Sequence, residues 1–246
     1  MIERFADIGG MNTFICHPER GGPHPVILFY MDAPGIREEL RGMARRLASA
    51  GYYVMLPNLY HRSGVEEIGN FIGEEGAATR KTMFALMASL TIALVMEDTE
   101  ALIACADADP AASKGPIGTV GYCMSGQYAI AAAARHPDRV RAAASIYGVR
   151  LKTDRPDSPH LAAQKANAEI YVAWAEIDHY APLEDLEPFR QSLDGVKAEV
   201  ELYKGVEHGF AFPERPAYNR DAAERHWERL FALYGRMLEG GAKHSL

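Results

Sequence analysis

The chain has 246 residues, of which 48% are hydrophobic and 24% are charged, the composition of an ordinary globular protein. Its formal net charge of −7, without basic runs, argues against nucleic acid or an anionic membrane as a partner. The first residues carry no basic-then-apolar signal pattern, and the three cysteines show no paired or metal-type spacing. We therefore expect a cytoplasmic protein with reduced thiols.

Short apolar runs alternate with amphipathic helical patterns along the whole sequence. The runs expected to form strands are 13–17, 26–30, 52–56, 116–120, 142–147, 170–175 and 198–203. The segments expected to form helices are 37–50, 80–106, 128–135, 184–194 and 215–238. The first of these strands is expected at a sheet edge, and 58–79 and 150–168 are expected to be largely irregular.

Strands that alternate with helices imply an α/β fold, in which a mostly parallel sheet is covered by helices on both faces. We expect one domain over 1–246, with a loose tail from about 240 onward.

A sharp strand-to-helix turn has Cys123 at its apex. Such a turn needs small residues on both sides, and Gly121, Ser125 and Gly126 supply them. This is the nucleophile-elbow pattern, with cysteine in place of the commoner serine. Ser125 is the weaker candidate nucleophile, because Gln127 would then occupy the crowded position two residues on. Taken alone, the turn is equally compatible with a buried structural cysteine.

Two later strands lead into loops that carry an acid and then a histidine, the order that follows the nucleophile in α/β-hydrolases. Asp178 comes just after one strand, and His208 comes just after the next. Glu176 and Asp185 are nearby carboxylates that compete for the role of the acid. The order and the strand-end placement favour a Cys123–His208–Asp178 triad.

With these residues in place, the chain resembles the dienelactone hydrolases over nearly its whole length. The resemblance is carried by the Gly-Tyr-Cys-x-x-Gly elbow, by Tyr147-Gly-Val, by Asp178 and by His208-Gly-Phe. It implies a single-domain α/β-hydrolase that needs no metal or organic cofactor and attacks an ester or lactone with a Cys-His-Asp triad. It also implies that Tyr147 contacts the substrate.

The resemblance assigns further roles in the site. Asp32 matches a carboxylate that holds the resting thiol, although it equally suits the start of a turn. The backbone N–H groups of Ala33 and Met124 would form the oxyanion hole, where one donor is worth about 3–4 kcal/mol. Arg80, or Lys81 beside it, matches an arginine that binds a substrate carboxylate.

The chain departs from the family pattern around the substrate. Phe212 stands where a second carboxylate-binding arginine is expected, and Arg215 would have to reach back to replace it. Phe84 and Met87 stand where aromatic pocket residues are expected on the long helix. These replacements predict a more apolar pocket than that of a dienelactone hydrolase.

The sequence thus predicts a hydrolase of a small ester or lactone, as a monomer or small homo-oligomer. One alternative is a broader carboxylesterase or thioesterase with an apolar pocket. Another is a catalytically silent α/β-hydrolase used for binding or sensing, which the presence of all three triad residues disfavours.

Overall fold

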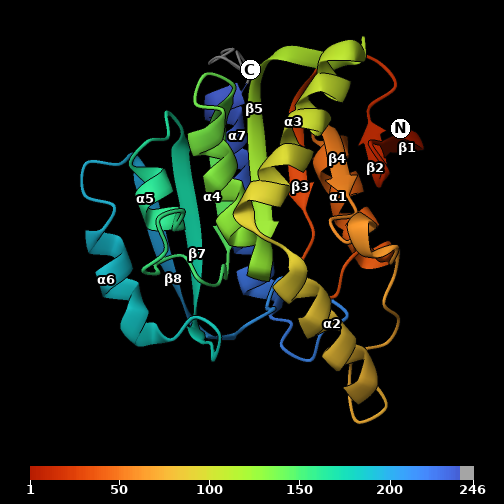
Figure 1. Ribbon diagram of the computed structural model, residues 1–246. Helices are drawn as coiled ribbons and strands as arrows, with labels where there is room; N and C mark the ends of the chain where they lie inside the picture. The colour runs from red at the N-terminus through yellow and green to blue at the C-terminus, as the bar shows by residue number, and fades with distance from the viewer. Residues whose placement is uncertain (239–246) are drawn as a thin grey trace. The chain divides into compact units, whose positions relative to one another are not determined.

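The computed structural model describes residues 1–238, so the tail expected from 240 lies outside the described residues. The chain forms two compact units, residues 1–113 and the residues from 114 onward. Figure 1 shows the elements of both units by label. None of the helices within residues 1–238 is long and apolar enough to cross a membrane.

The first unit contains four strands. In their order across the sheet they are β1 (Ile2–Ile8), β2 (Met11–His17), β4 (Tyr53–Pro57) and β3 (His24–Tyr30). Strand β2 is antiparallel to β1 and to β4, whereas β3 and β4 are parallel. The expectation that 13–17 is an edge strand was wrong, because β1 pairs along the whole of β2, from Ile2 opposite His17 to Ile8 opposite Met11.

The helical segments of the first unit are α1 (Glu38–Ser49), η1 (His61–Ser63), α2 (Ala77–Ser89) and α3 (Ile92–Ala108). Helices α1 and α3 cover opposite faces of the strands. Arg45 of α1 lies over the ring of Phe14, whereas Tyr30 bonds to Thr99 of α3, and the strand register puts Phe14 and Tyr30 on opposite faces.

The single helix expected over 80–106 was wrong, because α2 and α3 are separate helices. Leu90 has an extended backbone, with ψ 138°, and ends α2. The Thr91 side chain then accepts the Leu94 N–H and caps the start of α3.

The second unit contains four parallel strands in chain order. They are β5 (Ala112–Tyr122), which begins just before the boundary, β6 (Val140–Ile146), β7 (Glu169–Ile177) and β8 (Ala198–Glu207). Its helical segments are η2 (Cys123–Ser125), α4 (Gly126–Arg135), α5 (Pro159–Ala163), η3 (Leu183–Asp185), α6 (Leu186–Gln191) and α7 (Arg220–Leu238).

The final helix begins later than the expected residue 215, because Asn219 caps α7 by accepting the N–H of Ala222 at 3.0 Å.

Helices α4 and α7 cover opposite faces of these parallel strands (Figure 1). A Cβ on Gly118 would lie 2.9 Å from Tyr234 of α7, whereas the neighbouring Thr119 hydroxyl donates to the Ala129 carbonyl of α4 at 3.0 Å. Because adjacent residues of a strand point to opposite faces of the sheet, α4 and α7 lie in layers on opposite faces. The carboxyl ends of β5, β7 and β8 therefore lie at one edge, and each is followed by a candidate catalytic residue.

Candidate active site

Cys123 lies at the turn between β5 and α4, where the backbone takes an unusual conformation. Its φ is +55°, in the left-handed region that non-glycine residues rarely adopt. The Val149 N–H donates to the Cys123 carbonyl at 3.1 Å and holds the turn from the neighbouring segment. Strain that the surrounding structure enforces in this way is typical of functional turns.

The glycines of the turn are required by close contacts. A Cβ on Gly121 would lie 2.0 Å from the Ser125 carbonyl oxygen. A Cβ on Gly126 would lie 2.2 Å from the Ser145 hydroxyl oxygen and 2.7 Å from Gly148 Cα. Ser125 itself is fully buried, which disfavours it as the nucleophile, whereas Cys123 is partly exposed.

Asp178 and His208 meet beyond the ends of β7 and β8. Nδ1 of His208 lies 2.7 Å from Oδ2 of Asp178. Because a carboxylate only accepts hydrogen bonds, Nδ1 carries the proton in this bond. The other oxygen of Asp178 accepts the backbone N–H groups of Tyr180 at 2.8 Å and Ala181 at 3.2 Å. Hydrogen bonds to both of its oxygens therefore hold the Asp178 carboxylate in place.

The competing carboxylates are placed differently. Glu176 accepts the Gly205 N–H at 2.7 Å and so ties the two loops together. Asp185 is exposed in η3. Asp178 is the acid that meets His208.

The charge state of His208 follows from its neighbours. Burial would lower the pKa of His208, but the negative charges of Cys123 and Asp178, and its hydrogen bonds to both, raise that pKa to about 10. The side chain is 12% exposed, so these interactions are only weakly screened by solvent. These interactions stabilise the protonated, positively charged form of His208.

Aromatic rings flank His208. The ring of Tyr147 lies 4.9 Å from the imidazole and that of Tyr180 lies 5.0 Å from it, as measured between centroids. Tyr147, with φ +38°, is buried and packs in turn on Phe210 and Phe212. Tyr147 and Phe212, which were expected to contact the substrate, are both buried; Tyr147 lies against His208, and Phe212 lies against Tyr147.

Tyr180 was not anticipated from the sequence. It is 58% exposed and follows Asp178 by two residues. The signal available in the sequence was therefore a large aromatic residue close to the candidate acid.

Asp32 begins a turn in the first unit that the Gly35 N–H closes on the Asp32 carbonyl at 2.9 Å. Its carboxylate is completely buried, and both oxygens accept from Arg37, at 2.6 and 3.2 Å. Burial would lower the pKa of Arg37, but the carboxylates of Asp32 and Glu39 raise it. This ion pair favours the interpretation of Asp32 as a structural turn residue. The Ala33 carbonyl in the same turn accepts the Tyr60 hydroxyl at 2.7 Å.

Helix α2 carries the other expected substrate-binding residues. Arg80, in its first turn, donates to the carbonyls of Phe71 and Gly73 and so fastens the preceding loop. Lys81 and Phe84 are exposed, and Met87 is half-buried. Within residues 1–238, no group of three or more His, Cys, Asp or Glu side chains is arranged to hold a metal ion.

Comparison with known proteins identifies the family of this chain. Residues 11–238 match the dienelactone hydrolase family. The chain is 30% identical to a protein of Escherichia coli strain K12 named "Putative carboxymethylenebutenolidase", over 92% of this chain and 83% of that protein. It is 25% identical to a "Carboxymethylenebutenolidase" of Rhodococcus opacus, over 90% of this chain and 84% of that protein.

Among solved structures, one titled "Putative Dienelactone Hydrolase", from Klebsiella pneumoniae, matches with a TM-score of 0.81 at 23% identity. The match covers 96% of this chain and 98% of that one. This likeness shows the α/β-hydrolase fold, as the mostly parallel strands and their covering helices predicted. Together with the family match over 11–238, it establishes that the chain belongs to the dienelactone hydrolase family, whose members are hydrolases of carboxylic ester and lactone bonds.

Proposed function

We propose that this protein hydrolyses a small ester or lactone, with Cys123 as nucleophile, His208 as proton carrier and Asp178 as the group that orients His208. The supporting observation is the hydrogen bond of 2.7 Å between Nδ1 of His208 and Asp178, together with the interaction with Cys123 that helps to raise the pKa of His208. A nucleophile, a base and an orienting acid in this relation form a catalytic triad.

In the first half-reaction, the Cys123 thiolate forms a bond to the carbonyl carbon, and the carbonyl electron pair moves onto oxygen. The N–H of Met124, at the start of the elbow helix, is the donor we assign to this oxyanion, and Ala33 N–H is the second donor implied by the family resemblance. When the intermediate collapses, the C–O bond breaks and the His208 imidazolium gives its proton to the leaving alkoxide.

In the second half-reaction, neutral His208 takes a proton from water as the oxygen attacks the thioester. Collapse of this intermediate breaks the C–S bond, regenerates the thiolate beside an imidazolium and releases the acid. No external oxidant, metal or cofactor takes part in this cycle.

The second candidate function is that of an esterase for neutral, apolar esters, and the residues around the triad favour it. Three large side chains close in sequence to Asp178 are 44–58% exposed, namely Ile177, Tyr180 and Leu183. Arg80 is already engaged by backbone carbonyls, which gives it a role other than binding a carboxylate.

The test of the triad is hydrolysis of p-nitrophenyl acetate across pH, before and after treatment with iodoacetamide. Cys123→Ala is expected to abolish turnover while preserving the fold. Cys105→Ala is the matched control, because Cys105 is also a free, partly exposed thiol. Activity of Cys123→Ala close to wild type would exclude this mechanism.

A panel of neutral aryl esters and carboxylate-bearing lactones separates the two candidate functions. Lower kcat/KM for the lactones would favour the apolar esterase. A rise in KM upon Arg80→Ala that is confined to carboxylate-bearing substrates would restore Arg80 as an anion-binding residue and favour the lactone hydrolase.

A further inference from the structure

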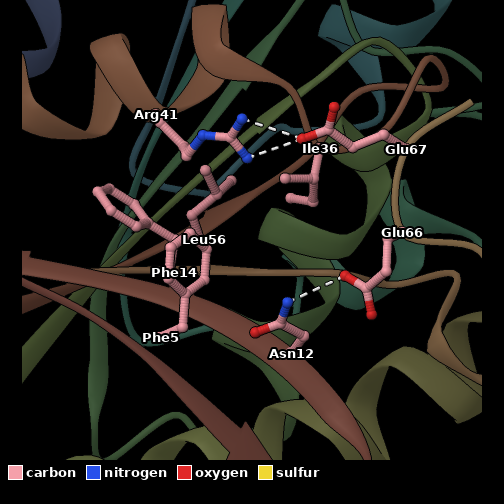
Figure 2. A pocket seen from close by; sticks show the side chains of 8 residues that line it. All are labelled: Phe5, Asn12, Phe14, Ile36, Arg41, Leu56, Glu66 and Glu67. Atoms are coloured by element: carbon pink, nitrogen blue, oxygen red, sulfur yellow. Dashed lines mark hydrogen bonds and ion pairs between the residues drawn. The ribbon is translucent and has the colours of Figure 1, made fainter. Parts of the chain in front are cut away.

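The first unit contains a cavity of about 290 Å³ that plays no part in the proposed reaction. Its lining residues come from β1, β2, β4, α1 and the loops that follow β3 and η1. They are Phe5, Asn12, Phe14, Ile36, Arg41, Leu56, Glu66 and Glu67 (Figure 2).

One side of the cavity is apolar. Phe5, Phe14 and Leu56 lie side by side across three neighbouring strands, because the register pairs Phe5 with Phe14 and Phe14 with Leu56. The two aromatic rings are 5.4 Å apart at a tilt of 54°. Phe5 is 59% exposed, although its neighbours Phe14 and Leu56 are buried. An aromatic ring exposed beside a cavity offers a surface for another apolar group.

The other side of the cavity carries two carboxylates, as Figure 2 shows. Glu66 accepts from the neutral amide of Asn12 at 3.0 Å, so its charge has no cationic partner in residues 1–238. Glu67 accepts both bonds from Arg41, each at 2.9 Å.

The basic residues near the cavity leave an excess of negative charge. Arg41 is shared between Glu67 and Glu38, and Arg45 is shared between Glu38 and Glu3. Two guanidinium groups therefore serve three carboxylates, and Glu66 is a fourth. Among the residues that line the cavity, Arg41 is positive and Glu66 and Glu67 are negative, a net charge of −1 that repels anions and attracts cations.

We propose that this cavity binds a small organic cation, of the arylalkylammonium class. Its aromatic body lies against the exposed ring of Phe5, and its ammonium group lies at Glu66 and Glu67. The volume of this cavity is at the lower limit of the range for ligand sites, so it suits a molecule of about ten non-hydrogen atoms. For a ligand of that size we expect a Kd on the order of 1 mM. An ammonium ion adds charge complementarity, and the Asn12 and Arg41 bonds hold the two carboxylates in place.

The probe is 2-phenylethylammonium, titrated into the full-length, isotope-labelled protein and followed by amide NMR shifts. The neutral isostere 2-phenylethanol and the anion phenylacetate are titrated in parallel. Glu66→Gln removes the charge but keeps an oxygen that can accept from Asn12, and Phe5→Ala removes an exposed ring. Glu184→Gln, at an exposed acid of the second unit, is the matched control.

We expect the ammonium probe to shift the amides of Phe5, Asn12 and Phe14 and to bind about fivefold more tightly than 2-phenylethanol. Glu66→Gln should remove that preference, Phe5→Ala should weaken both probes, and Glu184→Gln should change neither. The proposal is overturned if the three probes bind equally, if Glu66→Gln keeps the preference, or if no shift appears at these amides up to the solubility limit. These outcomes are independent of the triad, because Cys123→Ala protein should bind the probe unchanged.

Discussion

His208 is surrounded by groups that act on it in different ways. Asp178 fixes Nδ1, the interaction with Cys123 helps to raise the pKa of the imidazole, and Tyr147 packs against the ring from the buried side. Tyr180 lies against the ring at 5.0 Å and is 58% exposed, so we expect a bound substrate to contact it. The imidazole is oriented by packing as well as by hydrogen bonding.

Substitution of Tyr180 should therefore change substrate preference. Tyr180→Ala is expected to lower kcat/KM about tenfold for an aryl ester and much less for a methyl ester, because only the aryl group loses an apolar contact. Tyr180→Phe should retain nearly full activity on both. Steady-state kinetics on the two esters measure this, with Tyr218→Ala as a control at another exposed tyrosine. Equal losses on both esters from Tyr180→Ala would mean that the ring only positions His208.

At the scale of elements, the elbow depends on how closely α4 approaches the backbone after β6. Gly126→Ala should reduce stability by several kcal/mol or prevent folding, since its Cβ would lie 2.2 Å from the Ser145 hydroxyl oxygen. Gly42 in α1 is the matched control, because it has nothing within 4 Å of an added Cβ. Gly42→Ala should stabilise by about 0.5–1 kcal/mol through helix propensity. Urea unfolding measures both changes. Equal changes in unfolding free energy for the two variants would show that the structure around residue 126 adjusts to the added Cβ without cost.

The turn between β3 and α1 depends on a buried ion pair. Asp32→Asn should cost about 3–5 kcal/mol of unfolding free energy, because it leaves the largely buried Arg37 without its main partner. Arg45→Gln, which breaks two exposed ion pairs, should cost at most about 1 kcal/mol. The two variants are compared by urea unfolding at one pH. A loss below that of Arg45→Gln would mean that Glu39 holds Arg37 alone.

Much of the architecture was predictable from the sequence because local residue patterns indicate it. The central strands are continuous apolar runs, and the elbow, the acid and the histidine each follow such a run. The fold and the family are confirmed. The assignment of Cys123, Asp178 and His208 to catalysis stays a prediction that their geometry supports.

Other features depended on tertiary context. Strand β1 has a largely exposed, mixed sequence and is held by pairing with β2, so no local signal marks it. The break at Leu90 lies within a largely apolar run, and the cap that Thr91 makes there became evident only in the structure. The spacing of residues along the sequence also does not indicate where a side chain points. The burial of Phe212 and the pairing of Asp32 with Arg37 therefore appeared only in the structure.

At the scale of the whole molecule, the triad contributes to the pH dependence of stability. The pKa of His208 is about 10 in the folded protein, above its usual value near 6.5 in an unfolded chain. A raised pKa means that the folded state binds the proton more tightly. The contribution of His208 is therefore complete below about pH 6.5 and is lost as the pH rises towards 10.

Comparison of wild type with His208→Gln measures this contribution, because glutamine does not titrate. The difference in Tm should favour wild type at pH 6 and shrink steadily up to pH 10, by about 2–4 °C for each kcal/mol lost. Alkylation of Cys123 with iodoacetamide removes an interaction that raises the pKa of His208, so the decline should then begin at lower pH. His179→Gln, which changes an exposed histidine in the same loop, should leave the profile unaltered. A difference between wild type and His208→Gln that is constant across pH would show that His208 titrates at its ordinary pKa, and the imidazolium–thiolate pair would have to be abandoned.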